Sequence, residues 1–258
     1  MYRVAAFLCL LLLARAASAS VAPPPLRFSV AESWSMPLVL IEDHKPVSGI
    51  LFDIMQSLAR HVGREAEFVV LPRLRVQTAL GHGEVDIRCY AAQAWVPDIS
   101  GDYLWSLPIL FQRDMLIASA QTAAGPYPNQ FDNETIGTVL GYNYPALTHL
   151  FATHQLVRED ARSEEHALRK LIAGRYNYAA ASERVLSWIN RELPADQRLK
   201  PIALISEQAA GCIVRNDPAL PVQQILRTLV RMRVSGEIDR IIERYSAPPD
   251  GDSVAPLP

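Results

Sequence analysis

The sequence lacks an excess of basic residues, a dense set of cysteines and any long apolar run beyond its N-terminus. Its 25 Lys and Arg residues face 27 Asp and Glu residues, so the formal net charge is −2, whereas nucleic-acid-binding domains are usually strongly basic. Half of the residues are hydrophobic, and burying this much apolar surface offsets the entropy lost on folding. We therefore expect a globular protein that binds no nucleic acid. The 258 residues suit one large domain or two lobes of roughly 100 residues each.

The N-terminus has the pattern of a secretory signal peptide. Arg3 precedes an unbroken apolar run, Val4–Ala14, and small residues follow up to Ala19. A membrane anchor is the alternative, but a spanning helix needs about 20 apolar residues and this run is shorter. The sequence thus predicts a signal peptide over residues 1–19, cleavage after Ala19, export, and no stable insertion in the membrane. A Pro-rich spacer over residues 20–25 follows it.

Cysteine is scarce in the exported part of the chain. Only Cys89 and Cys212 lie outside the signal peptide, and they are far apart in the sequence. Export permits a disulfide, but two cysteines do not make a disulfide-dense scaffold. The favoured expectation is two separate buried thiols, and a bridge between them is the alternative.

Strands and helices are expected to alternate along the rest of the chain. Apolar residues recur at helical spacing from Phe52 to Val62, and Gly63 follows where helices commonly end. The expected strands are Leu26–Val30, Glu67–Leu71, Val85–Tyr90, Met115–Ser119, Ile136–Leu140, Gln155–Arg158, Tyr178–Ala181 and Gly211–Arg215. The other expected helices are Arg73–Leu80, Pro145–His154, Glu164–Ala173, Glu183–Arg191, Pro221–Val234 and Gly236–Tyr245. This order predicts an α/β fold with largely parallel strands, in two similar lobes with a cleft between them.

Five short motifs resemble, in order, those of the bacterial extracellular solute-binding proteins of family 3, the amino-acid-binding type. They are Gly49–Val62, Ala79–Asp86, Ile136–Gly141, Leu171–Arg175 and Leu229–Tyr245. The resemblance extends over nearly the whole exported chain and implies the type II periplasmic binding protein fold. Each lobe of that fold is a central, mostly parallel sheet flanked by helices, and two crossing strands form the hinge.

The resemblance also implies a domain organisation and a role. Lobe 1 would take residues 26–110 plus 213–246, lobe 2 would take residues 111–212, and residues 247–258 would be a disordered tail. Proteins of this family are usually monomeric, close on a small-molecule solute by a hinge motion, and deliver it to an inner-membrane ABC importer. The implied location is the periplasm, and the implied partner is an ABC permease, with a membrane sensor receptor as the alternative.

The family's charged anchors for an amino acid are not where they are expected. The family holds the solute's carboxylate with an Arg that follows the strand ending near Tyr90, and its ammonium with an Asp at the end of a second-lobe strand. Here the Arg position falls in Ala94–Asp98, which contains no Arg, and the Asp position falls on Ser182. Because an α-amino acid needs both a cation and an anion in its site, we expect a different polar solute, anionic or aromatic.

The candidate ligand-binding residues combine aromatic, amide and hydroxyl groups with one cation. Trp34 matches the aromatic wall of the family, and Arg73 would supply the missing cation if it faces the cleft. Arg88 is a weaker candidate, because an Arg pointing inward from a strand is costly unless it is paired. The candidate set is Trp34, Arg73, Tyr90, Gln93, Tyr142, Asn143, Tyr144 and Ser182.

An enzyme on the same scaffold is an alternative, because cyclohexadienyl dehydratases resemble this family. Such chemistry needs a general acid, and the only candidates, Glu32 and Glu183, belong to no recognisable constellation, so we assign no catalytic residue. The acidic cluster Asp160–Glu165 is interpreted as a solvated loop and helix start. No cofactor is predicted, and no metal site either, because His149 and His154 lie five apart on different faces of a helix.

Overall fold

The computed structural model describes residues 22–96, 101–122 and 131–246. The expected signal peptide over residues 1–19 and the expected tail over residues 247–258 lie outside the described residues. Within the described ranges, no helix is both long and apolar enough to cross a membrane.

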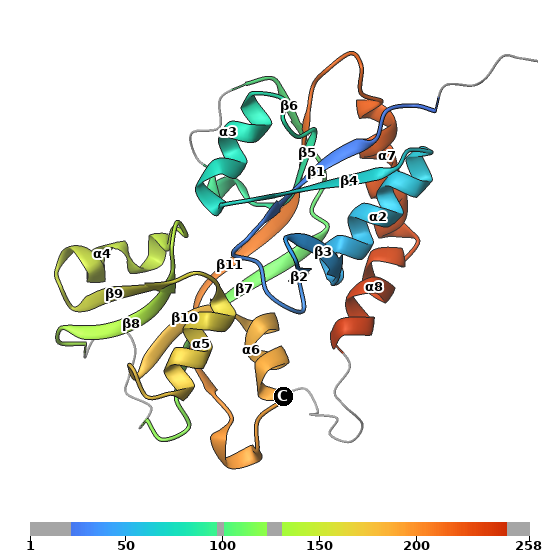
Figure 1. Cartoon of the computed structure of the whole chain (residues 1–258). Coiled ribbons are helices and arrows are strands. Elements are labelled where there is room, and N and C mark those ends of the chain that lie inside the picture. The colour runs from blue at the N-terminus through green and yellow to red at the C-terminus, as the bar shows by residue number, and fades with distance from the viewer. Residues whose placement is uncertain (1–21, 97–100, 123–130, 247–258) are drawn as a thin grey trace, which may run out of the picture.

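One mixed sheet runs through the molecule in the order β4-β1-β5-β11-β7-β10-β8-β9, with β6 also pairing with β11 (Figure 1). Its strands are β1 (Leu26–Ala31), β4 (Ala66–Leu71), β5 (Ile87–Ala91), β6 (Tyr103–Trp105), β7 (Leu110–Ala118), β8 (Glu134–Val139), β9 (Leu156–Ala161), β10 (Tyr178–Ser182) and β11 (Lys200–Arg215). A separate hairpin pairs β2 (Leu40–Glu42) with β3 (Lys45–Ser48). The β1–β4, β1–β5, β8–β9 and β8–β10 pairs are parallel, whereas the pairs made by β7 and β11 are antiparallel. Each lobe therefore has the expected parallel sheet, and two antiparallel strands join the lobes.

Lobe 1 is covered by helices α2 (Ile50–Val62), α3 (Val76–Gly81), α7 (Val222–Val234) and α8 (Glu237–Ser246). Helix α2 buries Ile50, Ile54 and Leu58 at a spacing of four residues, which places them on one face against the sheet. Gly63 ends the helix with φ 75°, a conformation that glycine adopts without steric cost. The Tyr245 hydroxyl donates a hydrogen bond to Asp53 Oδ2 over 2.9 Å. Two of the family-like motifs thus meet in space, and the C-terminal helix is fixed to lobe 1.

Lobe 2 holds helices α4 (Thr148–Ala152), α5 (Glu164–Ile172) and α6 (Glu183–Asn190), and 3-10 turns are η1 (Arg73–Arg75), η2 (Gln93–Trp95), η3 (Pro145–Leu147) and η4 (Ala195–Gln197). Helices α5 and α6 begin at serine N-caps, whose hydroxyls accept hydrogen bonds from backbone N–H groups inside the helix. The helix expected over Pro145–His154 is wrong at both ends. Its first turn is the 3-10 turn η3, and it stops where the Thr153 hydroxyl bonds the His149 carbonyl and His154 takes φ 57°.

Strands β7 and β11 connect the two lobes. They pair from Leu110 opposite Ala210 to Ala118 opposite Lys200, so one end lies in the lobe 1 core and the other extends into lobe 2 (Figure 1). The sequence predicted only the last part of β11, Gly211–Arg215, because polar residues interrupt the alternation in its first half. The exact boundaries between the lobes stay a prediction.

The two cysteines form a disulfide between β5 and β11. Cys89 and Cys212 lie directly opposite each other in the antiparallel register of these strands. The expectation of two separate thiols was therefore wrong. Their sequence separation of 123 residues concealed a pairing that the return of the chain into lobe 1 creates.

Candidate functional site

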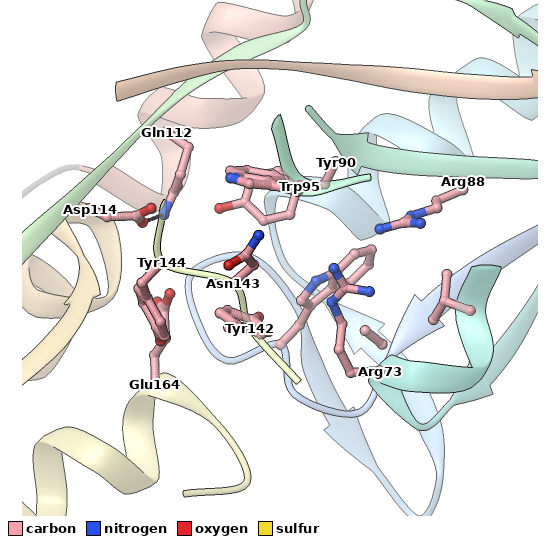
Figure 2. Close-up of a pocket in the computed structure, with 13 residues that line it drawn as sticks. Arg73, Arg88, Tyr90, Trp95, Gln112, Asp114, Tyr142, Asn143, Tyr144 and Glu164 are labelled. Atoms are coloured by element: carbon pink, nitrogen blue, oxygen red, sulfur yellow. Dashed lines mark hydrogen bonds between the residues drawn. The ribbon is translucent and has the colours of Figure 1, made fainter. Parts of the chain in front are cut away.

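A pocket of about 590 Å³, measured to its open mouth, lies between the two lobes (Figure 2). Lobe 1 contributes Ala31, Trp34, Arg73, Val76, Arg88, Tyr90 and Trp95, and the side of lobe 2 and β7 contributes Gln112, Asp114, Tyr142, Asn143, Tyr144 and Glu164. No cluster of His, Cys, Asp and Glu in the described part of the chain is suited to a metal ion.

Two arginines form what we call the basic wall of the pocket, Arg73 and Arg88. Arg73 opens η1 after the Pro72 turn, and Arg88 points inward from β5 with 4% of its surface exposed. The Arg88 guanidinium donates to Gln77 Oε1 over 2.8 Å, and the Arg73 guanidinium lies over the Tyr142 ring. Neither arginine has an ion-pair partner among the described residues. Burial, together with the charge of Arg73, lowers the pKa of Arg88 to about 9, so it is charged at neutral pH.

Two carboxylates form the acidic wall on the opposite side (Figure 2). Glu164, the first residue of α5, is 7% exposed and accepts a hydrogen bond of 2.6 Å from the Ser182 hydroxyl. Asp114, on β7, accepts hydrogen bonds from the Gln112 amide and the Ser206 hydroxyl. Burial, together with the nearby Asp114, raises the pKa of Glu164 to about 7, and burial also raises the pKa of Asp114.

Aromatic rings line the pocket between these walls. Tyr90 contacts Trp34 edge to face, with ring centroids 5.9 Å apart, and contacts Trp95 with centroids 5.3 Å apart. Tyr90 has φ 59°, a strained conformation for a bulky residue, one position after the disulfide-bonded Cys89. Strain of this kind persists only where the surroundings hold the residue in place, and it is common at functional sites.

The loop after β8 brings lobe 2 against lobe 1. The Ser33 hydroxyl donates a hydrogen bond of 3.3 Å to the Tyr142 hydroxyl, and the Arg73 guanidinium lies 5.8 Å from the centre of the Tyr142 ring. Gly141 has φ 77°, and a side chain there would meet Leu74 Cδ2 at 3.0 Å. Glycine therefore allows the two lobes to approach each other at this edge of the pocket.

Six of the eight candidate residues line this pocket: Trp34, Arg73, Tyr90, Tyr142, Asn143 and Tyr144. The other two do not. Gln93 is exposed on η2, and Ser182 is fully buried at the N-cap of α6, from where its hydroxyl bonds Glu164.

Sequence reasoning missed the acidic wall. The interpretation of Asp160–Glu165 as a solvated cluster was wrong for Glu164, because Ser163 starts α5 and turns this side chain inward while Glu165 points outward and pairs with Arg169. The acids named instead do not line the pocket: Glu32 is exposed, and Glu183 pairs with Arg113 outside it. Ser182 was the one signal available, since the Glu164 carboxylate lies beside the residue that replaces the family's Asp.

No family model matches the chain, and no curated protein sequence matches it. Solved structures match it well in fold. An ancestral arginine-binding protein bound to arginine superposes with a TM-score of 0.73 and 16% identity, over 88% of this chain and 100% of that one. A histidine kinase sensor domain with similarity to periplasmic binding proteins gives 0.69, 19%, 87% and 96%. An arginine transport-system periplasmic binding protein from Legionella pneumophila gives 0.68, 16%, 86% and 99%. The chain has the two-lobed fold of the periplasmic amino-acid-binding proteins.

Proposed function

We propose that the protein is a periplasmic solute-binding protein that captures a small polar solute with an anionic group in the pocket between its lobes. The observation that carries this proposal is the basic wall, where Arg73 and Arg88 face the pocket without a carboxylate partner among the described residues. Partly or fully buried cations are unfavourable unless they are compensated. A carboxylate or similar anion compensates them, because guanidinium groups bind such anions through paired hydrogen bonds.

The remainder of the lining suits recognition of a small molecule. Trp34, Tyr90 and Trp95 offer flat apolar surface, and the Asn143 amide offers a donor and an acceptor. A few placed polar groups in a largely aromatic cavity are typical of small-molecule sites. Closure would occur by bending at β7 and β11, which join the lobes.

We propose delivery to an ABC importer as the physiological role, with a monomeric protein in the periplasm. The structural likeness to a transport-system binding protein supports this role. The likeness to a histidine kinase sensor domain supports the alternative, in which solute occupancy is passed to a membrane receptor. Genes for a permease and an ATPase next to this gene would favour import.

The test is thermal unfolding of the purified protein with a panel of dicarboxylates, aromatic carboxylates and α-amino acids, and with putrescine and spermidine as amines that have no anionic group. We expect stabilisation by members of the anionic classes and none by the polyamines, since a bound solute stabilises the folded state in proportion to its occupancy. Stabilisation by polyamines alone would overturn the proposal. Mass spectrometry of solute released from natively purified protein identifies the compound directly.

A dehydratase-like activity is the second candidate, and one observation favours it. The pocket contains a buried acid, Glu164, whose pKa of about 7 suits a general acid at neutral pH. Incubation with prephenate and arogenate, followed by chromatography of the products, distinguishes turnover from binding.

A further inference from the structure

The acidic wall presents hydrogen-bond acceptors to the pocket with no cation to meet them. Asp114 and Glu164 have no ion-pair partner among the described residues. Gln112, which lies on β7 beside Asp114, is 2% exposed and lines the same pocket. Its amide nitrogen bonds Asp114 Oδ1 over 2.7 Å, and its Oε1 is buried without a hydrogen-bond partner. An unsatisfied buried acceptor is costly, so this wall is built for a donor that comes from outside the protein.

The charges around Glu164 do not neutralise it. On its own helix, Glu165 is paired with Arg169, and on β9 Asp160 is paired with Arg158. At the start of α6, Glu183 is paired with Arg113.

The groups that do face Glu164 are acids, hydroxyls and distant cations. Asp114 raises its pKa, and the Ser182 hydroxyl lowers it. The phenols of Tyr90, Tyr142 and Tyr144 lie near it, and burial raises the pKa of each, so they stay protonated. Arg184 donates to the Phe111 carbonyl, and Arg73 and Arg88 stand on the opposite wall (Figure 2).

We propose that Gln112, Asp114 and Glu164 form a subsite for a primary ammonium group, which displaces a proton that the two carboxyl groups share when no cation is bound. An ammonium carries three N–H donors, and the wall offers three acceptors: two carboxylates and the free Gln112 Oε1. Two carboxylates without a counter-ion retain a proton between them, and the pKa of about 7 for Glu164 agrees with this. A bound ammonium supplies the missing charge, so the proton leaves to water.

This subsite rests on the proposed function and narrows the class of solute. The basic wall binds the anionic group and the acidic wall binds the ammonium, so the solute is a zwitterion that spans the pocket from lobe 1 to lobe 2. The anion anchor of the family is thereby moved from the position of Ser182 to a carboxylate on the neighbouring helix, hydrogen-bonded to Ser182.

The test compares carboxylates with and without an amine, in isothermal titration calorimetry on the full exported chain. The probes are L-glutamate against glutarate and L-phenylalanine against 3-phenylpropanoate. In each pair that binds, we expect the amino compound to bind at least tenfold more tightly at pH 8. Its affinity falls about tenfold from pH 8 to pH 6, because protons compete for Glu164. Repeating the titration in phosphate and in Tris measures the proton released.

Two variants separate the subsite from its surroundings. Glu164→Gln should abolish both the proton release and the pH dependence, while Glu165→Gln, one residue away and paired outside the pocket, should keep both. If the amine-free compounds bind equally well and independently of pH, the ammonium subsite is refuted while the proposed function stands. If no carboxylate of either kind binds, both proposals fail.

Discussion

The two walls of the pocket carry opposite charges, and they differ in how fixed those charges are. Arg88 has a pKa of about 9 and stays charged at neutral pH, whereas Glu164 has a pKa of about 7 and changes charge there. The basic wall is also held rigidly, since Arg88 precedes the disulfide-bonded Cys89 on β5. Lobe 1 therefore offers a permanent anchor and lobe 2 an adjustable one. Each wall alone is unfavourable, and a solute that carries both charges relieves the two together.

Arg88→Gln should have the largest effect on binding, because it removes the permanent anchor. We expect the affinity for the carboxylate that stabilises the protein most to fall by about 4 kcal/mol, roughly 1000-fold. The unfolding free energy of the unliganded variant should stay unchanged or rise, since an unpaired buried cation is lost. Calorimetric titration and urea unfolding measure the two quantities. Arg75→Gln is the matched control, because Arg75 is exposed and pairs with Glu84, and an equal loss of affinity there would contradict the assignment.

Glu164→Gln should change how stability depends on pH. The folded protein holds the proton of Glu164 with a pKa of about 7, raised from 4.5, so it binds this proton more tightly than the unfolded chain does. The unfolding free energy of the wild type should therefore decrease as pH rises from 4.5 to 7, by about 3 kcal/mol from this residue. The variant should lack that component.

Urea unfolding at pH 5, 6, 7 and 8 measures this difference. Glu165→Gln is the control, and its pH profile should follow that of the wild type. A wild-type profile that matches the Glu164→Gln profile would show that the acidic wall is not adjustable.

Ser182→Ala should have an intermediate effect, confined to lobe 2. The substitution removes the hydrogen bond to Glu164 and the N-cap of α6, which together stabilise the fold by about 2 kcal/mol. It should also raise the pKa of Glu164 further, because that hydrogen bond lowers it. Thermal unfolding checks the stability. Ser187→Ala, on the exposed face of the same helix, should change it little, and equal losses in the two variants would contradict this role.

Tyr142→Phe should have the smallest effect and should report contact between the walls. It removes the hydrogen bond from Ser33 and keeps the ring beneath Arg73. We expect a loss of about 0.5 kcal/mol in unfolding free energy and less than a tenfold loss in affinity. Tyr142→Ala, which also removes the ring, should lose more of both. If the two variants behave alike in titration and unfolding, the ring contributes nothing.

Local patterns were enough to predict the fold, because they act through nearby residues. The buried spacing of α2 and the glycine after it are visible in the sequence, and so are the motifs that contain Asp53 and Tyr245. The acidic wall was not predictable in this way. Glu164 and Ser182 are 18 residues apart, and only the packing of α5 beside β10 brings them together. Asp114 lies inside an apolar strand, where nothing local distinguishes a pocket residue from a paired surface acid.

The Cys89–Cys212 bond makes lobe 2 a closed loop of the polypeptide. The chain leaves lobe 1 after Cys89 and returns at Cys212, so the helices and parallel strands of lobe 2 all lie between the two bonded sulfurs. If a protease cuts this excursion at one position, the two products remain one covalent molecule. A chain nicked between residues 90 and 211 would thus run as a single species on a non-reducing gel, and would separate into two fragments only after reduction.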